Sequence, residues 1–288
     1  MHAVQIHFDG DIAKNHQVSM RTLGKTLIHL QNSFDRACIE RRKGALWKHA
    51  KMPQAFYADV ELLVQEPQEG GYVLDFFSKN AVTKAIIDRV SAAVKQAADS
   101  ATQTGISQMP DIETQLRIKK TQIEHQIITP SDFNTLISQP NPSVIRRYGD
   151  RAIVREVDQI LSIIRSSHAG NSTFELTLFG STQTSFRFNK NQAKTFHNIV
   201  SERQLGDPVI YNAEVKSLDK PNRSGKITNL GTRKGANIIF ADEYDLKQAI
   251  PFFESGANMR FIGCPFIEYG AFDPLAGDIF FVELSSNG

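Results

Sequence analysis

The chain has 288 residues, of which 41% are hydrophobic and 22% charged, and these ordinary values exclude wholesale disorder and fibrous classes. With 33 Lys and Arg against 31 Asp and Glu, the formal net charge is only +2. There is thus no global attraction to nucleic acid or anionic membranes, and any such binding must depend on a local group of charges. Two cysteines are too few for a disulfide framework and lack the spacing of metal ligands.

The length predicts two domains, since domains commonly have about 100 to 200 residues. Residues 2–8 alternate polar and apolar side chains and lack the continuous apolar core of a signal peptide. No apolar run approaches the ~20 residues that are needed to cross a bilayer. We therefore expect a cytoplasmic protein that is neither exported nor embedded in a membrane.

Residues 1–168 are predicted to form an α+β domain with two long helices and a β-hairpin. The predicted elements are a strand over 3–8, a helix over 19–42, a hairpin of strands over 56–64 and 72–77, a helix over 80–104, a short helix over 132–137 and an amphipathic helix over 153–164. Ser19 is a suitable N-cap for the first long helix, and Gly44 a suitable C-cap. Gly105 is expected to end the second. Residues 106–128 fit neither a helical nor a strand period and stay unassigned.

Residues 169–288 are predicted to form the second domain, because the apolar period changes from helical to alternating at 168–172. A hairpin near 174–188 and a helix around 196–200 lead into five further strands, which are predicted over 209–218, 226–230, 236–241, 259–267 and 279–284. One helix separates the third of these strands from the fourth. This order resembles a small closed barrel of the OB type, which binds oligonucleotides or oligosaccharides on strands two and three and the neighbouring loops.

A group of cations occupies the first three predicted barrel strands and the loops between them. Its members are Lys216, Lys220, Arg223, Lys226, Arg233 and Lys234, with only Glu214 and Asp219 as counter-charges. Such a group attracts phosphates whatever the base sequence, and the attraction depends on salt. The nearest aromatic residues are Tyr211, Phe240 and Tyr244, which would add base stacking if their rings lay on the same face. The alternative is that the cations are solvated loop residues and the aromatic residues belong to the barrel core.

Two strings of residues have the composition of metal-dependent active sites. Glu214 and Lys216 form the E-x-K element of restriction-type nucleases, which also needs an aspartate from an earlier neighbouring strand. The nearest aspartate, Asp207, lies seven residues upstream of Glu214 on the same predicted strand. In the loop after the first strand, Asp9, Asp11 and His16 offer two carboxylates and an imidazole, but such a loop is more often a solvated turn.

Other enzyme signatures are incomplete or absent. Ser224 to Lys226 resembles the end of a phosphate-binding loop, but Lys220 stands where its first glycine belongs and Ile227 where its Ser or Thr belongs. His168, His197 and Cys264 fall on different predicted elements. The sequence contains no G-x-S-x-G, G-x-G-x-x-G, H-E-x-x-H or C-x-x-C motif. We therefore assign no catalytic residue, no metal and no cofactor.

The sequence favours a non-catalytic binding protein. We expect the barrel to bind nucleic acid, and the N-terminal domain to bind a protein partner or a second copy of the chain through its long helices, as in an accessory subunit of a larger cytoplasmic system. Two alternatives stay open. The chain is a protein-interaction or scaffold module without nucleic-acid contact, or it is a metal-dependent hydrolase or nuclease that uses Asp9, Asp11 or Glu214.

Overall fold

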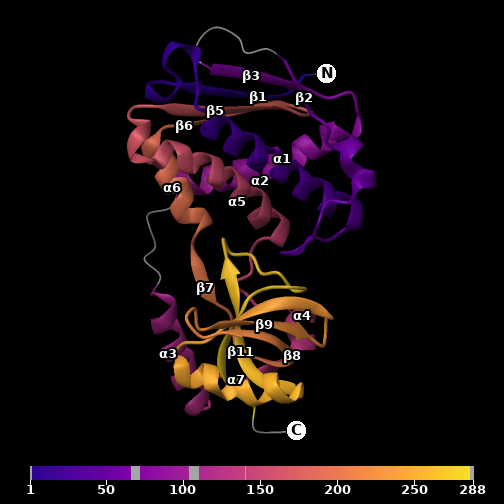
Figure 1. Ribbon diagram of the computed structural model, residues 1–288, viewed down its shortest axis with the longest axis vertical. Coiled ribbons are helices and arrows are strands. Elements are labelled where there is room, and N and C mark those ends of the chain that lie inside the picture. Colours follow the sequence, from indigo (N-terminus) through magenta and orange to yellow (C-terminus); the bar gives the residue numbers. More distant parts are fainter. Residues whose placement is uncertain (1, 66–71, 104–109, 140, 286–288) are drawn as a thin grey trace. The chain divides into compact units, whose positions relative to one another are not determined.

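A computed structural model describes residues 2–65, 72–103, 110–139 and 141–285 of the chain (Figure 1). It contains two compact units, each built from separate stretches of sequence. Unit 1 comprises Met1–Leu46, Ala50–Ser107 and Gly149–Ser201, and unit 2 comprises Trp47–His49, Gln108–Tyr148 and Glu202–Gly288. The predicted α+β class with a small barrel is confirmed.

Unit 1 is built on a five-stranded antiparallel sheet of order β2-β3-β1-β5-β6. Its strands are β1 (His2–Asp9), β2 (Leu63–Val64), β3 (Tyr72–Phe77), β5 (Thr173–Phe179) and β6 (Gln183–Phe188). The central strand β1 pairs with both β3 and β5, so that Ile6 lies opposite Leu74 on one side and Leu176 on the other. This long-range pairing holds the predicted β5–β6 hairpin in unit 1. The units therefore divide after residue 201, and not at the expected boundary of 168–172.

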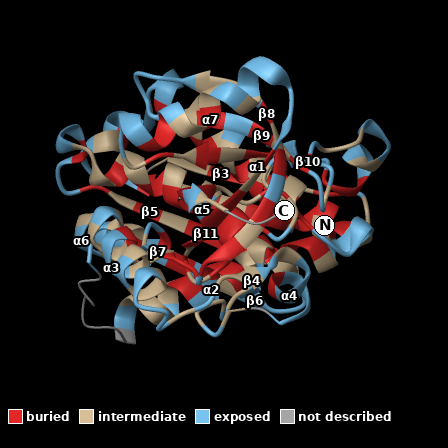
Figure 2. Cartoon of the chain, turned by 90° about the horizontal axis from the view of Figure 1, so that it is seen from below, coloured by how far each residue is buried: buried red, intermediate tan, exposed pale blue. Residues whose placement is uncertain are grey.

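Four helices cover one face of this sheet (Figure 1). They are α1 (Met20–Lys43), α2 (Val82–Gln103), α5 (Tyr148–Arg165) and α6 (Lys190–Val200), which lie where the sequence predicts them. Their inner sides carry fully buried residues such as Phe34, Val90 and Ile160, and buried residues also line the strands (red in Figure 2). Gly105, which was expected to end α2, lies outside the described residues.

The two ends of α1 have the predicted caps. The Ser19 side-chain oxygen accepts a hydrogen bond from the Thr22 backbone N–H at 3.1 Å, and Gly44 adopts a left-handed conformation with φ 71°. A serine hydroxyl satisfies an N–H that the first helical turn leaves without a partner, and glycine takes a positive φ without a Cβ clash.

Replacing Ser19 with Ala is expected to lower the free energy of unfolding by about 1 kcal/mol, because the Thr22 N–H loses its acceptor. Urea unfolding followed by far-UV circular dichroism measures the change. Ser100→Ala is the control, since this half-buried Ser donates to the Gln96 carbonyl near the end of α2 and does not cap a helix N-terminus. Equal stability of Ser19→Ala and wild type would show that the cap contributes nothing.

The predicted strand over 56–64 is mostly wrong. Residues Gln54–Asp59 form a 3-10 helix, η2, and only β2 pairs with β3. The reason is tertiary, because the Asp59 carboxylate is 7% exposed and accepts from Arg42 Nε at 2.7 Å and from Asn80 Nδ2 at 3.2 Å. These bonds hold η2 against residues that precede and follow it in sequence.

Unit 2 is a closed five-stranded barrel. Its strands are β8 (Val209–Asp219), β9 (Ser224–Asn229), β10 (Lys234–Ile239), β11 (Asn258–Glu268) and β12 (Ile279–Leu284). They follow the order β8-β9-β10-β12-β11, and pairing of β11 with β8 closes the barrel. The β10–β12 pair is parallel, and α7 (Glu243–Ser255) precedes β11. The predicted OB-like order is therefore confirmed. Short strands β7 (Arg203–Leu205) and β4 (Ser131–Asp132) extend β11 and β8.

Aromatic rings fill the barrel. Phe261 stacks between Tyr211 and Phe281, with ring centroids 5.5 Å and 5.8 Å apart. Residues of α7, among them Leu246 and Ala249, belong to the same core cluster. The predicted short helix is α4 (Phe133–Ser138), whose Phe133 ring lies 5.5 Å from Tyr211.

The segment that the sequence left unassigned contains α3 (Ile112–Glu124). Leu116 of α3 belongs to a second apolar cluster with Ile262 and Cys264 of β11 and Phe280 and Val282 of β12. These strand residues point away from the barrel core, so α3 covers the outer face of β11 and β12. Ile239, at the end of β10, also packs against this cluster, whereas the outer face of β9 and of the first part of β10 is left open.

Candidate nucleic-acid interface

The open face of β9 and β10 is polar and carries a cation at its centre. Inward-pointing Ile227 and Ala236 lie opposite each other and are buried. Lys226, which points outward, lies opposite Asn237, and it is exposed while Asn237 is half-buried. In OB-type barrels this is the face that binds oligonucleotides or oligosaccharides.

The six predicted cations do not form one cluster, because the two loops that hold half of them lie at opposite ends of the barrel. The loop over 220–223 lies beside α7, where Lys220 Nζ pairs with Glu243 Oε1 at 2.9 Å. The loop over 230–233 lies at the other end of β9, where Thr232 Oγ1 donates to the Leu275 carbonyl at 2.9 Å. The six residues of β9 between them span about 20 Å at ~3.3 Å per residue. The cations therefore form a stripe along the barrel.

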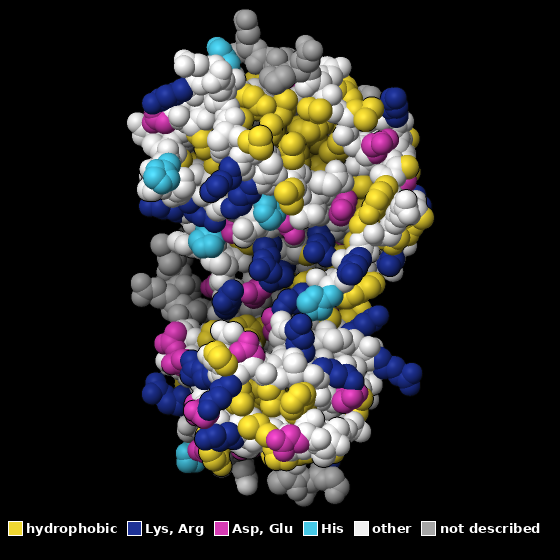
Figure 3. All heavy atoms as spheres, in the orientation of Figure 1, with side chains coloured by type: hydrophobic (Ala, Val, Ile, Leu, Met, Phe, Trp, Pro, Cys, Tyr) yellow, Lys and Arg dark blue, Asp and Glu magenta, His cyan; other side chains and the backbone are white. Residues whose placement is uncertain are grey.

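The members of this stripe differ in how far they are neutralised. Lys216 forms an ion pair with Glu214, Lys220 pairs with Glu243, and Arg223 donates to the Ala241 carbonyl. Lys226 and Arg233 form no ion pair with any residue that the structure describes. Lys234 Nζ lies 5.2 Å from the centre of the Trp47 ring. In Figure 3, Lys and Arg side chains are scattered among hydrophobic and acidic ones over the visible face of unit 2.

Two of the residues expected to stack on bases are not at the surface. Tyr211 is 1% exposed and Phe240 2%, and the Phe240 ring lies 5.3 Å from Phe281 inside the barrel. Tyr211 shares the inward face of β8 with Val209 and Ala213. Burial raises the pKa of the Tyr211 hydroxyl above its usual range. A stacking role for Tyr211 and Phe240 is therefore corrected, because their rings belong to the core.

Two other rings lie near the ends of the stripe. Tyr244, at the start of α7, is 73% exposed and directly follows Glu243, the partner of Lys220. Trp47, the only Trp of the chain, is half-buried beside Lys234. Sequence reasoning had Tyr244 among its candidates but missed Trp47.

Trp47 reaches the barrel because the segment Trp47–His49 packs into unit 2 although its neighbours in sequence belong to unit 1. The Lys48 backbone N–H donates to Asp273 Oδ2 at 2.6 Å, and Lys48 Nζ donates to Asp278 Oδ1 at 2.6 Å. Burial raises the pKa of Asp273, and the N–H groups of Lys48, Leu275 and Ala276 oppose that rise by donating to its carboxylate. No local pattern in the sequence indicates this docking.

A cavity of about 420 Å³ adjoins the 220–223 loop on the side of α3. Arg117, Lys120 and Arg223 line it together with Glu113 and Glu124. Lys120 Nζ pairs with Asp245 Oδ2 at 3.1 Å, whereas Arg117 is exposed. Arg117 thus adds a cation to this end of the stripe, and sequence reasoning missed it because α3 was unassigned.

The groups of the nuclease hypothesis are not brought together. Asp207 accepts from Lys119 Nζ at 2.7 Å and from Asn141 Nδ2 at 2.8 Å, while Glu214 and Lys216 pair with each other. The E-x-K pair therefore lacks its aspartate in this arrangement. Cys264 is buried under α3, and burial raises the pKa of its thiol to about 12, which keeps it protonated.

The loop after β1 is shaped by hydrogen bonds. Asp11 Oδ2 accepts from the Asn171 backbone N–H at 3.1 Å, and Asp11 Oδ1 lies 3.1 Å from Lys14 Nζ. These bonds lower the pKa of the Asp11 carboxyl, with the Asn171 N–H as the larger cause. Within the described ranges, no three His, Cys, Asp or Glu side chains are grouped so that they could hold a metal ion.

None of the described helices is long and apolar enough to cross a membrane. No protein-family model matches the chain, and neither a curated protein nor a solved structure is detectably similar to it. Function must therefore be inferred from the barrel's own geometry and charge, because an OB-like fold alone does not specify a ligand.

Proposed function

We propose that the barrel binds single-stranded nucleic acid along the outer face of β9 and β10. The observation that carries the proposal is the position of Lys226, an exposed cation without an ion-pair partner among the described residues, at the centre of the face that α3 leaves open. Arg233, in the turn before β10, and Lys234, the first residue of β10, add exposed positive charge at one end of these two strands. Phosphates attract such cations whatever the base sequence.

The neighbours of these cations favour an unpaired strand as the ligand. Thr228 offers a hydroxyl on the same strand as Lys226, and Asn237, whose Nδ2 donates to Asp278 Oδ1 at 3.0 Å, offers its side-chain oxygen as an acceptor. Tyr244 and Trp47, near the two ends of the stripe, offer rings on which bases can stack, and stacking on a side chain requires a base that is free of its duplex neighbours. A face of about 20 Å suits a short single strand, since OB-type domains contact about 4 to 16 nucleotides.

The test is fluorescence anisotropy of a labelled oligonucleotide of about 12 nucleotides, single-stranded or in a duplex, titrated with the full chain. We expect the single strand to bind more tightly and its affinity to fall about 20-fold between about 50 and 200 mM salt, because three phosphate contacts give a slope near −2. The fluorescence of Trp47 should change on binding. Absence of binding at the lower salt, or affinity that salt does not alter, would contradict the proposal.

A second candidate function, a protein-interaction module, is favoured by an apolar hollow in unit 1. Residues of α1, β2 and β3 and of the segment before β2 line a cavity of about 470 Å³, among them Leu27, Ile28, Leu62, Val64 and Phe76. Ile28 is 61% exposed and Val64 58%. Under this hypothesis, Glu in place of Arg223, Arg233 and Lys234 leaves function intact. Under the nucleic-acid proposal, the same changes weaken it.

A further inference from the structure

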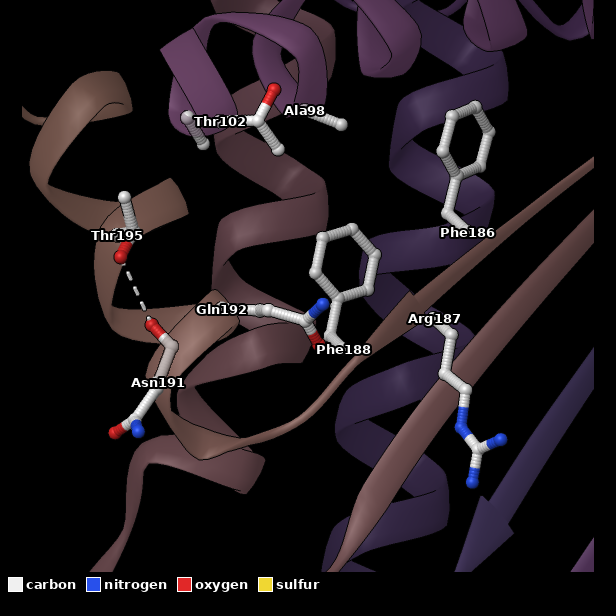
Figure 4. A pocket seen from close by; sticks show the side chains of 9 residues that line it. Ala98, Thr102, Phe186, Arg187, Phe188, Asn191, Gln192 and Thr195 are labelled. Carbon is white, nitrogen blue, oxygen red and sulfur yellow. Dashed lines mark hydrogen bonds between the residues drawn. The ribbon is translucent and has the colours of Figure 1, made fainter. Parts of the chain in front are cut away.

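Unit 1 has a second cavity, of about 320 Å³, where the last turns of α2 meet β6 and the start of α6 (Figure 4). Phe186 and Phe188 are two residues apart on β6, so their rings point to the same side of the sheet. Ala98 and Ala101 of α2 lie among the lining residues, and their small side chains leave the space beside the rings open. Cavities of about 300 to 1,000 Å³ with an aromatic lining commonly hold small molecules.

The polar groups around this cavity offer both donors and acceptors. The Asn191 side-chain amide has no hydrogen-bond partner among the described residues. Gln192 Oε1 accepts from the Asn189 N–H at 2.9 Å, which leaves its Nε2 free to donate. Thr102 and Thr195 donate their hydroxyl protons to the carbonyls of Asp99 and Asn191, so their oxygens can still accept.

Among the described residues that line the cavity, only Arg187 is charged. Figure 4 shows the Arg187 side chain extending away from the Phe188 ring, so it does not act as a counterion beside the rings. This direction follows from strand alternation, because Arg187 stands between the two inward phenylalanines. A charged group placed against the rings would lose its hydration without gaining a partner.

We propose that this cavity binds an uncharged, planar aromatic molecule that carries an amide-like group. The ring of the ligand packs against Phe186 and Phe188, and its amide exchanges hydrogen bonds with Asn191 and Gln192. The site lies wholly in unit 1 and does not depend on nucleic-acid binding by the barrel.

Three probes with the same ring test the charge preference: benzamide, benzoate and benzylamine. Saturation-transfer NMR on the full chain should show saturable binding of benzamide with a dissociation constant on the order of 1 mM, as expected for so small a ligand. Benzoate and benzylamine, both charged at neutral pH, should bind at least tenfold more weakly. Equal binding of the three probes would overturn the proposal.

Variants locate the binding. Ala101→Phe fills the cavity and should weaken benzamide binding at least tenfold, whereas Ala92→Phe, at an exposed position of the same helix, should leave it unchanged. Asn191→Leu removes the amide from an exposed position without entering the core and should weaken binding about fivefold while the thermal midpoint stays constant. If neither Ala101→Phe nor Asn191→Leu alters the affinity for benzamide, the ligand binds elsewhere and the assignment is overturned.

Discussion

Replacing both Lys226 and Arg233 with Glu is expected to weaken binding of a single-stranded oligonucleotide about 30-fold, equivalent to about 2 kcal/mol. Both side chains are exposed, and neither pairs with an acid in the described part of the chain, so their charge is available to phosphates. Each replacement removes one phosphate contact and adds a repelling carboxylate. Anisotropy titrations of variant and wild type at the same low salt concentration measure the loss.

The salt dependence gives a second readout of the same variant. Loss of two of three contacts should reduce the slope of log affinity against log salt by about 1.4, since each contact to a single strand contributes about 0.7. Lys84→Glu combined with Lys194→Glu is the matched control, because it changes the net charge equally at exposed positions of unit 1. If this control loses as much affinity as the Lys226 and Arg233 variant, the binding follows net charge and not the β9–β10 face.

The barrel could be predicted because its strands are patterned locally. In β8 the residues Val209, Tyr211, Ala213 and Val215 alternate with more exposed ones. Turn residues stand at the ends of each later strand. A strand that is buried on one face must have this period of two. The same alternation already places Tyr211 with the core residues, so its burial could have been predicted from the sequence as well.

Elements that are fixed by distant residues could not be predicted. In α3, Ile112, Leu116 and Ile123 face the barrel at helical spacing, but Ile118 is 46% exposed and obscures the pattern. In η2, the buried Asp59 is bound by Arg42 and Asn80, neither of which is a sequence neighbour. Local propensity is a weak guide where such contacts decide the conformation.

The candidate site was predictable in its residues but not in its layout. The cations of the barrel can be read from the sequence, whereas their arrangement as a stripe follows from the ends at which the loops over 220–223 and 230–233 lie. Trp47 is distant in sequence from β10 and reaches Lys234 through the docking of Lys48 on Asp273 and Asp278. No periodicity can report a contact of this kind.

A partly buried group of charges in unit 1 is expected to contribute strongly to stability. Arg89 of α2 lies between Glu40 of α1 and Asp150 of α5, with nitrogen–oxygen distances of 2.7 Å and 2.8 Å. The Arg89 side chain is 23% exposed, and each acid is 15% exposed. Burial opposes the charge of the guanidinium, but the two carboxylates outweigh this effect and raise the pKa of Arg89. Arg89 thus links the three helices and supplies the positive charge that neutralises the two partly buried carboxylates.

Arg89→Met should lower the free energy of unfolding of unit 1 by about 3 kcal/mol, because it keeps the length of the side chain but removes the guanidinium that neutralises the partly buried carboxylates of Glu40 and Asp150. Urea unfolding followed by circular dichroism reports the helices, while the fluorescence of Trp47 reports unit 2. Lys95→Met is the matched control on α2, since its pair with Asp99 is exposed and should contribute less than about 1 kcal/mol. If both variants lose equally little stability, the Glu40, Arg89 and Asp150 group does not hold the helices together. If Arg89→Met lowers the stability measured by circular dichroism by the expected amount and shifts the Trp47 fluorescence transition less, the destabilisation lies in unit 1.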